Sequence, residues 1–72
     1  MKKTFVLEEL DCANCAAKME DGIRKLEGVN FAAVNFFAQK LILDADDARF
    51  EEILAAAQKV ISRVDSNCKI VR

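Results

Sequence analysis

The feature that most constrains the fold is a pair of strand-like apolar runs, residues 31–36 and 41–43, separated by a short interruption that contains Gln39 and Lys40. In an extended chain, Ala32, Val34 and Phe36 of the first run fall on one face, and Ala33 and Asn35 fall on the other, which suits a strand. Parallel neighbouring strands need a crossover of about a dozen residues or more, which this interval cannot hold. The two runs must therefore pair as an antiparallel hairpin, and the rest of the chain has to fold around it.

A strand-like run and a helix-like run precede the hairpin. Residues 4–10 alternate as expected of a strand with one buried face. Residues 13–27 carry an apolar stripe at helical spacing, made of Ala16, Met19, Ile23 and Leu26. Such a stripe opposite charged residues predicts an amphipathic helix. Gly28 follows the stripe and can adopt the left-handed conformation that closes helices.

A second helix-like run and a last strand-like run follow the hairpin. Residues 50–64 have apolar side chains at helical spacing, with acidic residues before them that suit the positive end of a helix dipole. Residues 65–67 are turn formers, and residues 68–71 are strand-like. The order β-α-β-β-α-β predicts an α+β, ferredoxin-like sandwich, in which two helices cover one face of a four-stranded antiparallel sheet. A chain of this length has room for one domain, residues 1–72.

The charge and the apolar pattern exclude several classes of protein. Eleven basic and 12 acidic side chains give a net charge of -1, so no wide positive field exists for nucleic-acid binding. Glu8 and Glu9 interrupt the first apolar residues, which excludes a signal peptide, and no apolar run approaches the ~18 residues of a membrane span. Three cysteines are not a disulfide framework. We therefore expect a soluble, cytoplasmic unit with reduced thiols that does not insert into a membrane.

The motif that carries chemistry is a C-x-x-C pair, Cys12 and Cys15, between the first predicted strand and the first predicted helix. Asp11 stands directly before it. A turn of this kind brings two thiols within reach of one ion, or of each other, at the end of a helix dipole that favours thiolate. The pair therefore indicates a soft-metal site or a redox dithiol. The predicted topology places it at the same end of the sheet as Phe37 and residues 65–68.

Asp11 favours a divalent metal over copper(I). A carboxylate is a hard ligand from which a monovalent soft ion gains little, whereas Zn(II) commonly combines carboxylate oxygen with thiolate sulfur. Two thiolates and one carboxylate leave a smaller excess of negative charge around a divalent ion than around a monovalent one.

The turn also resembles that of a known family. Residues 10–16, Leu-Asp-Cys-Ala-Asn-Cys-Ala, resemble the metal-binding turn of the heavy-metal-associated domain, and residues 26–29 and 32–36 match the family's run from first helix into second strand. Copper and mercury members usually have Gly-Met-Thr before the first cysteine. The Asp-Cys-x-x-Cys form is similar to the branch attached to zinc-, cadmium- and lead-exporting P-type ATPases. The resemblance implies Asp11, Cys12 and Cys15 as ligands of Zn(II), Cd(II) or Pb(II).

The resemblance also implies a biological setting. The domain would regulate the exporter or deliver ions to it from the amino terminus, at the cytoplasmic face of the membrane, and would itself catalyse no reaction. Its partners would be the ATPase core or another metal-exchange protein. We expect a monomer without metal and a metal-bridged dimer as a further form. Leu10, at the family's methionine position, is expected to anchor the loop in the core, and Glu9, at its glycine position, to change the backbone shape or to add an acidic ligand.

Other interpretations of the cysteine pair and of Asp11 stay open at this stage. The domain could be a free-standing copper(I) chaperone, or a thiol-disulfide redox module. Cys12 and Cys15 could be small buried hydrophobic residues. Asp11 could act only as the N-cap of the first helix, by accepting backbone N–H bonds.

Three further residues near the pair have two interpretations each, and a fourth has one. Cys68 is either a core residue of the last strand or an extra sulfur ligand. Lys18 is either a solvated residue or a cation that stabilises thiolate. Phe37 is either a partly buried hairpin residue or an exposed apolar contact beside the site. Met19 lies on the apolar stripe and is expected in the core.

Overall fold

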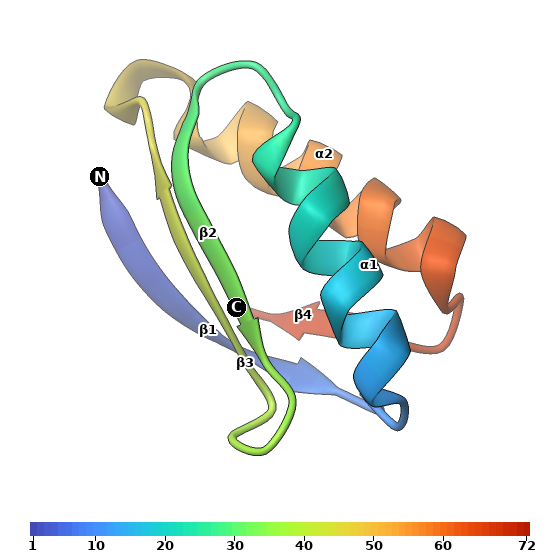
Figure 1. The fold of residues 1–72 in the computed structure, drawn as a ribbon. Coiled ribbons are helices and arrows are strands. Elements are labelled where there is room, and N and C mark those ends of the chain that lie inside the picture. Colours follow the sequence, from blue (N-terminus) through green and yellow to red (C-terminus); the bar gives the residue numbers. More distant parts are fainter.

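The computed structural model describes all residues from Met1 to Arg72. Two helices lie side by side on one face of a four-stranded sheet, and the opposite face is open (Figure 1). The elements in chain order are β1 (Lys2–Glu8), α1 (Ala13–Arg24), β2 (Val29–Asn35), β3 (Lys40–Ala45), a 3-10 turn (Asp47–Arg49), α2 (Phe50–Val64) and β4 (Lys69–Val71). The predicted ferredoxin-like β-α-β-β-α-β sandwich is confirmed.

The strand order in the sheet is β2-β3-β1-β4, and every neighbouring pair is antiparallel. The hairpin predicted at the centre of the sequence is formed by β2 and β3, with Asn35 opposite Lys40. Val6 of β1 lies opposite Lys40 on one side and Val71 on the other. This register places the end of β1, the hairpin turn and the start of β4 at one end of the sheet.

Among the element boundaries that differ from the predicted ones are the end of β1, beside the cysteine motif, and the end of α1. β1 ends at Glu8 and not at Leu10, because Glu9 has a left-handed φ of 58° that cannot continue a strand. α1 ends at Arg24 and not at residue 27. The N–H groups of Lys25 and Leu26 bond to the carbonyls three residues back, which tightens the last turn and stops the helix.

One buried cluster holds the two layers together, and no polar or charged side chain is buried in it. The predicted stripe of α1 contributes Ala16, Met19 and Ile23, while Leu26 is half-buried at its edge. Met19 is fully buried, as expected. Inward-facing residues of the strands and the apolar face of α2 fill the rest; they include Leu7, Ala32, Leu41, Leu43, Ala45, Phe50, Ile53, Leu54, Ala57 and Ile61.

The edge strand β2 is protected by side chains of α1. Glu20 accepts a hydrogen bond from the N–H of Val34 at 2.9 Å, and the Nε of Arg24 donates to the carbonyl of Ala32 at 2.8 Å. These groups point away from β3 and would otherwise lack a partner. α1 is therefore fixed to the hairpin by hydrogen bonds as well as by packing.

The opposite edge strand, β4, is protected by α2. The amide of Gln58 accepts from the N–H of Ile70 at 2.8 Å and donates to the carbonyl of Cys68 at 3.2 Å. One side chain thus replaces the two hydrogen bonds that a further strand would make. Both edges of the sheet are closed to strand addition in this way.

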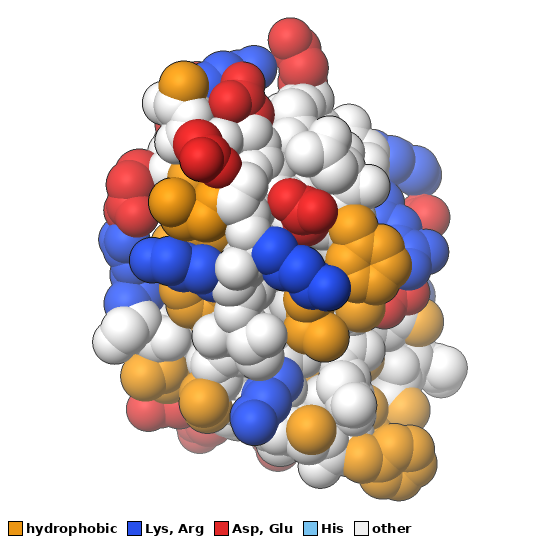
Figure 2. All heavy atoms as spheres, turned by 90° about the vertical axis from the view of Figure 1, so that its left-hand side faces the viewer, with side chains coloured by type: hydrophobic (Ala, Val, Ile, Leu, Met, Phe, Trp, Pro, Cys, Tyr) orange, Lys and Arg blue, Asp and Glu red, His pale blue; other side chains and the backbone are white.

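The face of the sheet away from the helices is mixed in character. Hydrophobic side chains on it are separated by Lys, Arg, Asp and Glu side chains (Figure 2). Val6 and Phe31 are both partly exposed, and Lys2 lies 5.9 Å from the ring centroid of Phe31. Neither positive nor negative side chains dominate this face.

No helix is both long and apolar enough to cross a bilayer.

Candidate metal site

The loop between β1 and α1 carries the cysteine motif and begins with an unusual backbone. Glu9 adopts a left-handed conformation, which glycine adopts without strain and a glutamate does not. The following residue, Leu10, is only 2% exposed and anchors the loop in the core, as predicted. The loop therefore keeps a conformation suited to glycine although its sequence has glutamate there. The side chain of Glu9 is exposed.

The amide of Gln39, in the hairpin turn, holds this loop. Its Nε2 donates to the carbonyl of Leu10 at 2.6 Å and to the carbonyl of Phe36 at 2.8 Å, while its Oε1 accepts from the N–H of Leu10 at 3.3 Å. The carbonyl of Gln39 also accepts from the N–H of Leu7 at 2.8 Å. Sequence analysis missed this residue, and only its position in the hairpin next to the site could have drawn attention to it.

The N-cap of α1 is Cys12 and not Asp11. Cys12 has extended dihedral angles, φ −131° and ψ 121°, and its Sγ accepts a hydrogen bond from the N–H of Cys15 at 3.2 Å. The interpretation of Asp11 as the helix cap is therefore wrong. Asp11 lies one residue before the cap, and its side chain is exposed and takes part in no hydrogen bond or ion pair.

The two thiols of the motif are partly exposed and differ in acidity. The pKa of Cys12 is lowered, first by a hydrogen bond from the thiol of Cys15 and then by the N–H of Cys15 and the charge of Lys18. The pKa of Cys15 is raised, because its thiol gives that hydrogen bond and because burial and the charges of Cys12 and Asp65 disfavour a second thiolate. Cys12 is therefore the more acidic thiol of the pair. Neither cysteine belongs to the fully buried core, which contradicts their interpretation as core hydrophobes.

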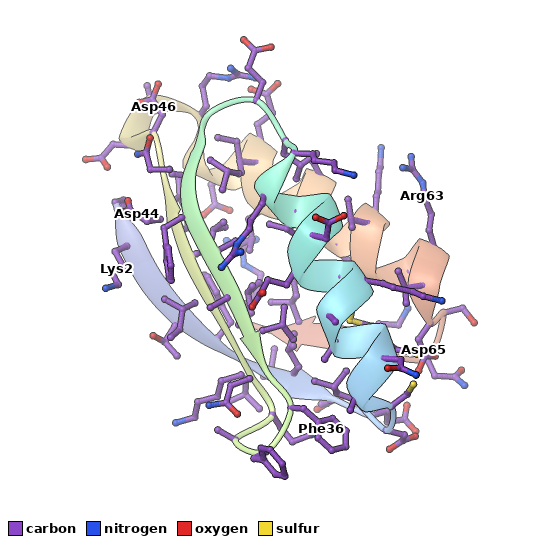
Figure 3. All side chains as sticks on the ribbon, viewed as in Figure 1. Lys2, Phe36, Asp44, Asp46, Arg63 and Asp65 are labelled. Atoms are coloured by element: carbon purple, nitrogen blue, oxygen red, sulfur yellow. The ribbon has the colours of Figure 1, made fainter.

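Asp65, just after α2, lies on the side of the molecule where α1 begins (Figure 3). Glu8 at the end of β1 pairs with Lys69 at the start of β4, so the turn into β4 lies beside the cysteine loop, as the predicted topology requires. The charge of Asp65 helps to raise the pKa of Cys15. Cys68 completes this turn and is fully buried in the core cluster. Burial raises the pKa of the Cys68 thiol first, and the charges of Asp65 and Asp11 raise it further.

The candidate ligands do not form a ready-made cluster. Nowhere in the chain do three or more Cys, Asp or Glu side chains converge as they would around a metal ion. Asp11 and Cys12 lie in the loop before α1 and Cys15 lies in its first turn, with the Asp11 side chain exposed to solvent. Cys68 lies below the loop in the core. The arrangement is therefore an open one, in which a third ligand has to move to join the two sulfurs.

The remaining residues singled out near the site lie as follows. Lys18 is exposed, and its charge lowers the pKa of both Cys12 and Cys15. Phe37 is 95% exposed, so its interpretation as a partly buried residue is wrong. Its ring contacts Phe36 edge-on, with centroids 5.6 Å apart. An exposed aromatic ring therefore stands on the hairpin turn.

A hollow of the surface has no residue of the cysteine loop in its lining. It has a volume of about 270 Å³, between α2 and β4, and is lined by Leu54, Ala55, Gln58, Ile70 and Arg72. None of these residues is a thiol or a carboxylate. The candidate ligands Asp11, Cys12 and Cys15 therefore lie outside this hollow.

Known proteins share both the sequence and the fold. The chain is 34% identical over 70 residues to a cadmium, zinc and cobalt-transporting ATPase of Bacillus subtilis, covering 97% of this chain and 10% of the relative. It is 44% identical over 50 residues to a zinc/cadmium/lead-transporting P-type ATPase of Escherichia coli, covering 69% of this chain and 7% of the relative. The chain thus spans a tenth or less of the length of these relatives.

Solved structures give the same picture. The N-terminal domain of ZntA in its Zn(II) form is 30% identical, with a TM-score of 0.73 over 97% of this chain and 88% of that one. The CopZ metallochaperone has a TM-score of 0.75 over 99% of this chain and 100% of that one, but its 20% identity shows the fold alone. A sequence model of the heavy-metal-associated domain matches residues 4–64. This chain belongs to the heavy-metal-associated domain family.

Proposed function

We propose that this domain binds a soft divalent ion, Zn(II), Cd(II) or Pb(II), reversibly through Asp11, Cys12 and Cys15. It would do so as the N-terminal regulatory or delivery domain of a heavy-metal-exporting P-type ATPase, at the cytoplasmic face of the membrane. The observation that carries the proposal is the pairing of two partly exposed thiols at a helix start with a carboxylate that has no other partner.

The state of the two thiols suits metal uptake. The pKa of Cys12 is lowered by the hydrogen bond from Cys15, and the pKa of Cys15 is raised by the same bond. A divalent ion that reaches the Cys12 thiolate supplies positive charge that also favours deprotonation of Cys15. Binding should therefore release a proton, and the positive end of the α1 dipole stabilises the resulting pair of thiolates.

Asp11 can join the two sulfurs at small cost. Because its carboxylate makes no hydrogen bond or ion pair, a rotation of its side chain toward the cysteines breaks no contact. The third ligand leaves one position of a tetrahedral ion free for water or for a ligand from a partner. Such incomplete ligation permits transfer to the ATPase core or another exchange protein through a shared intermediate. It also permits a metal-bridged dimer of a chain that is monomeric without metal.

The choice of a divalent ion over copper(I) rests on Asp11 and on the relatives. The carboxylate adds little for copper(I) but completes a common zinc ligand set. The two ATPase relatives described above are 34% and 44% identical to this chain over the matched residues. Their names describe them as transporters of cadmium, zinc, cobalt or lead. Structures whose titles name copper match this chain at lower identity, for example 26% for CopA of Bacillus subtilis and 17% for a yeast copper transporter domain.

A thiol-disulfide redox role is a second candidate. The unequal acidity of Cys12 and Cys15 is also what a dithiol needs to attack a disulfide. In that case, the pair would form a disulfide that a dithiol reductant cycles readily, and Asp11 would have no part in it.

Competition among metals tests the proposal. Zinc, cadmium and copper(I) affinities are measured against chelators for the reduced wild-type domain, for Asp11→Ala and for Asp21→Ala. Asp21 is an exposed carboxylate further along α1, paired with Lys25, and serves as the control. Asp11→Ala is expected to weaken zinc binding by about 10-fold or more and to leave copper(I) unchanged. Equal zinc affinity in wild type and Asp11→Ala would remove the carboxylate from the site.

A further inference from the structure

We propose that Gln39 is a positioning residue for the metal site, which acts by fixing the backbone from which Asp11 projects. The inference rests on the proposed function, since it concerns how that site is held. Gln39 comes from the hairpin, 29 residues away from Leu10 in sequence, and reaches the cysteine loop through its side-chain amide.

The contacts of Gln39 fall on the peptide groups directly before the motif. The carbonyl of Leu10 accepts from Nε2 at 2.6 Å, and the N–H of Leu10 donates to Oε1 at 3.3 Å. The carbonyl of Leu10 belongs to the same planar peptide group as the N–H of Asp11. A hydrogen bond that fixes this oxygen fixes the plane, and so the direction in which the Asp11 side chain leaves the backbone.

Asp11 is positioned only through the residues on either side of it. Its side chain is exposed and free of hydrogen bonds and ion pairs, and it contributes nothing to the buried core. On its C-terminal side, Cys12 is fixed as the N-cap of α1. On its N-terminal side, the buried Leu10 is fixed by Gln39. Asp11 therefore bridges two fixed points, and at one of them the amide of Gln39 sets the orientation of the peptide group while burial holds the Leu10 side chain.

The chemistry of the amide matches this task. The NH₂ group donates to two carbonyls, those of Leu10 and Phe36, while the oxygen accepts from the N–H of Leu10. A carboxylate has no donors and an ammonium has no acceptor, so neither could make all three bonds. A residue that only closed the hairpin would need the bond to Phe36 alone. The two bonds to Leu10 serve the loop.

A double-mutant cycle between Gln39 and Asp11 tests the inference. Zinc and copper(I) affinities are measured for wild type, Gln39→Met, Asp11→Ala and the double variant. Methionine has a similar length but none of the hydrogen bonds. Gln39→Met is expected to weaken zinc binding by about 10-fold in the wild-type background, as the loss of a residue that orients a ligand does. It should weaken zinc binding by less than about 2-fold when Asp11 is already absent, and leave copper(I) affinity unchanged.

Two further variants keep the result clear. Gln39 has a left-handed φ of 57°, so Gln39→Gly removes the amide without backbone strain and replaces Gln39→Met if that variant does not fold. Arg24→Met is a control: it removes the hydrogen bond from the Arg24 side chain of α1 to the backbone of the hairpin, away from the cysteine loop. It should change zinc affinity by less than about 2-fold. Equal weakening by Gln39→Met with and without Asp11, a matching loss for copper(I), or no loss at all would overturn the inference. A failure of the proposed function is distinguishable, because Asp11→Ala alone would then bind zinc like wild type.

Discussion

Replacing Gly28 with alanine should destabilise the domain through two separable effects. Gly28 has φ +90° in the turn between α1 and β2, a conformation that costs an L-residue about 1–2 kcal/mol. A Cβ at this position would also lie 2.7 Å from Cδ1 of Ile53, which is 2% exposed and has little room to move. Overpacking of this kind costs about 1–3 kcal/mol. Gly28→Ala should therefore lower the free energy of unfolding by about 2–5 kcal/mol.

That loss is large for a domain of this size, whose total stability is expected to be about 4–11 kcal/mol. Urea unfolding followed by circular dichroism measures it, and with a slope near 1 kcal/mol/M the midpoint should fall by about 2 M or more. Ile53→Val separates the two effects because it removes Cδ1. Alone, it should cost about 0.5–1.5 kcal/mol. In the Gly28→Ala background it should restore stability or cost nothing, since it relieves the clash.

Two outcomes for the Gly28 and Ile53 variants would refute this reasoning. A loss below about 0.5 kcal/mol for Gly28→Ala would show that the turn tolerates a side chain and that φ is not restrictive there. Ile53→Val costing the same in both backgrounds would show that the steric contact contributes nothing, and the whole effect would then belong to the backbone.

Two further predictions concern the thiols. Alkylation of the metal-free domain, followed by mass spectrometry, should modify Cys12 first and Cys15 next. The pKa values of the two thiols are shifted in opposite directions, so the rate at Cys12 should rise at a pH below the usual thiol range and the rate at Cys15 at a pH above it. Cys68 should react only after unfolding, and a fast reaction there would contradict its burial. Cys68→Ser should leave the cadmium-to-thiolate absorbance per bound ion unchanged, while the buried hydroxyl lowers stability by about 1–3 kcal/mol; a loss of absorbance would make Cys68 a ligand.

The six main elements could be predicted because each buries one face and so imposes a period on the sequence. The apolar stripe of α1 and the short interval between residues 36 and 41 were sufficient for the topology. The end of α1 was not predictable, because the choice between an α-helical turn and a 3-10 turn at Lys25 and Leu26 depends on small differences in local hydrogen bonding. The left-handed φ of Glu9 carries no sequence signal either, since glutamate rarely adopts it.

The site was predictable in its position but not in its details. The placement of Cys12 and Cys15 at a strand-to-helix turn follows from the spacing of apolar residues, which is that of a strand before the motif and that of a helix after it. The N-cap is Cys12 and not Asp11, and this places a sulfur at the capping position. The role of Gln39 depends on a contact between segments far apart in the chain, which no local pattern encodes.

The hydrogen bond from the N–H of Cys15 to the Sγ of Cys12 links the first turn of α1 to the chemical state of one sulfur atom. If an ion binds that sulfur as proposed, the charge seen by this N–H changes, and so does the tendency of the helix end to fray. Amide hydrogen exchange at Cys15 should then differ between loaded and empty domains. Occupancy would be detectable in the backbone even for a colourless ion, and any partner that contacts this helix end would meet two different surfaces.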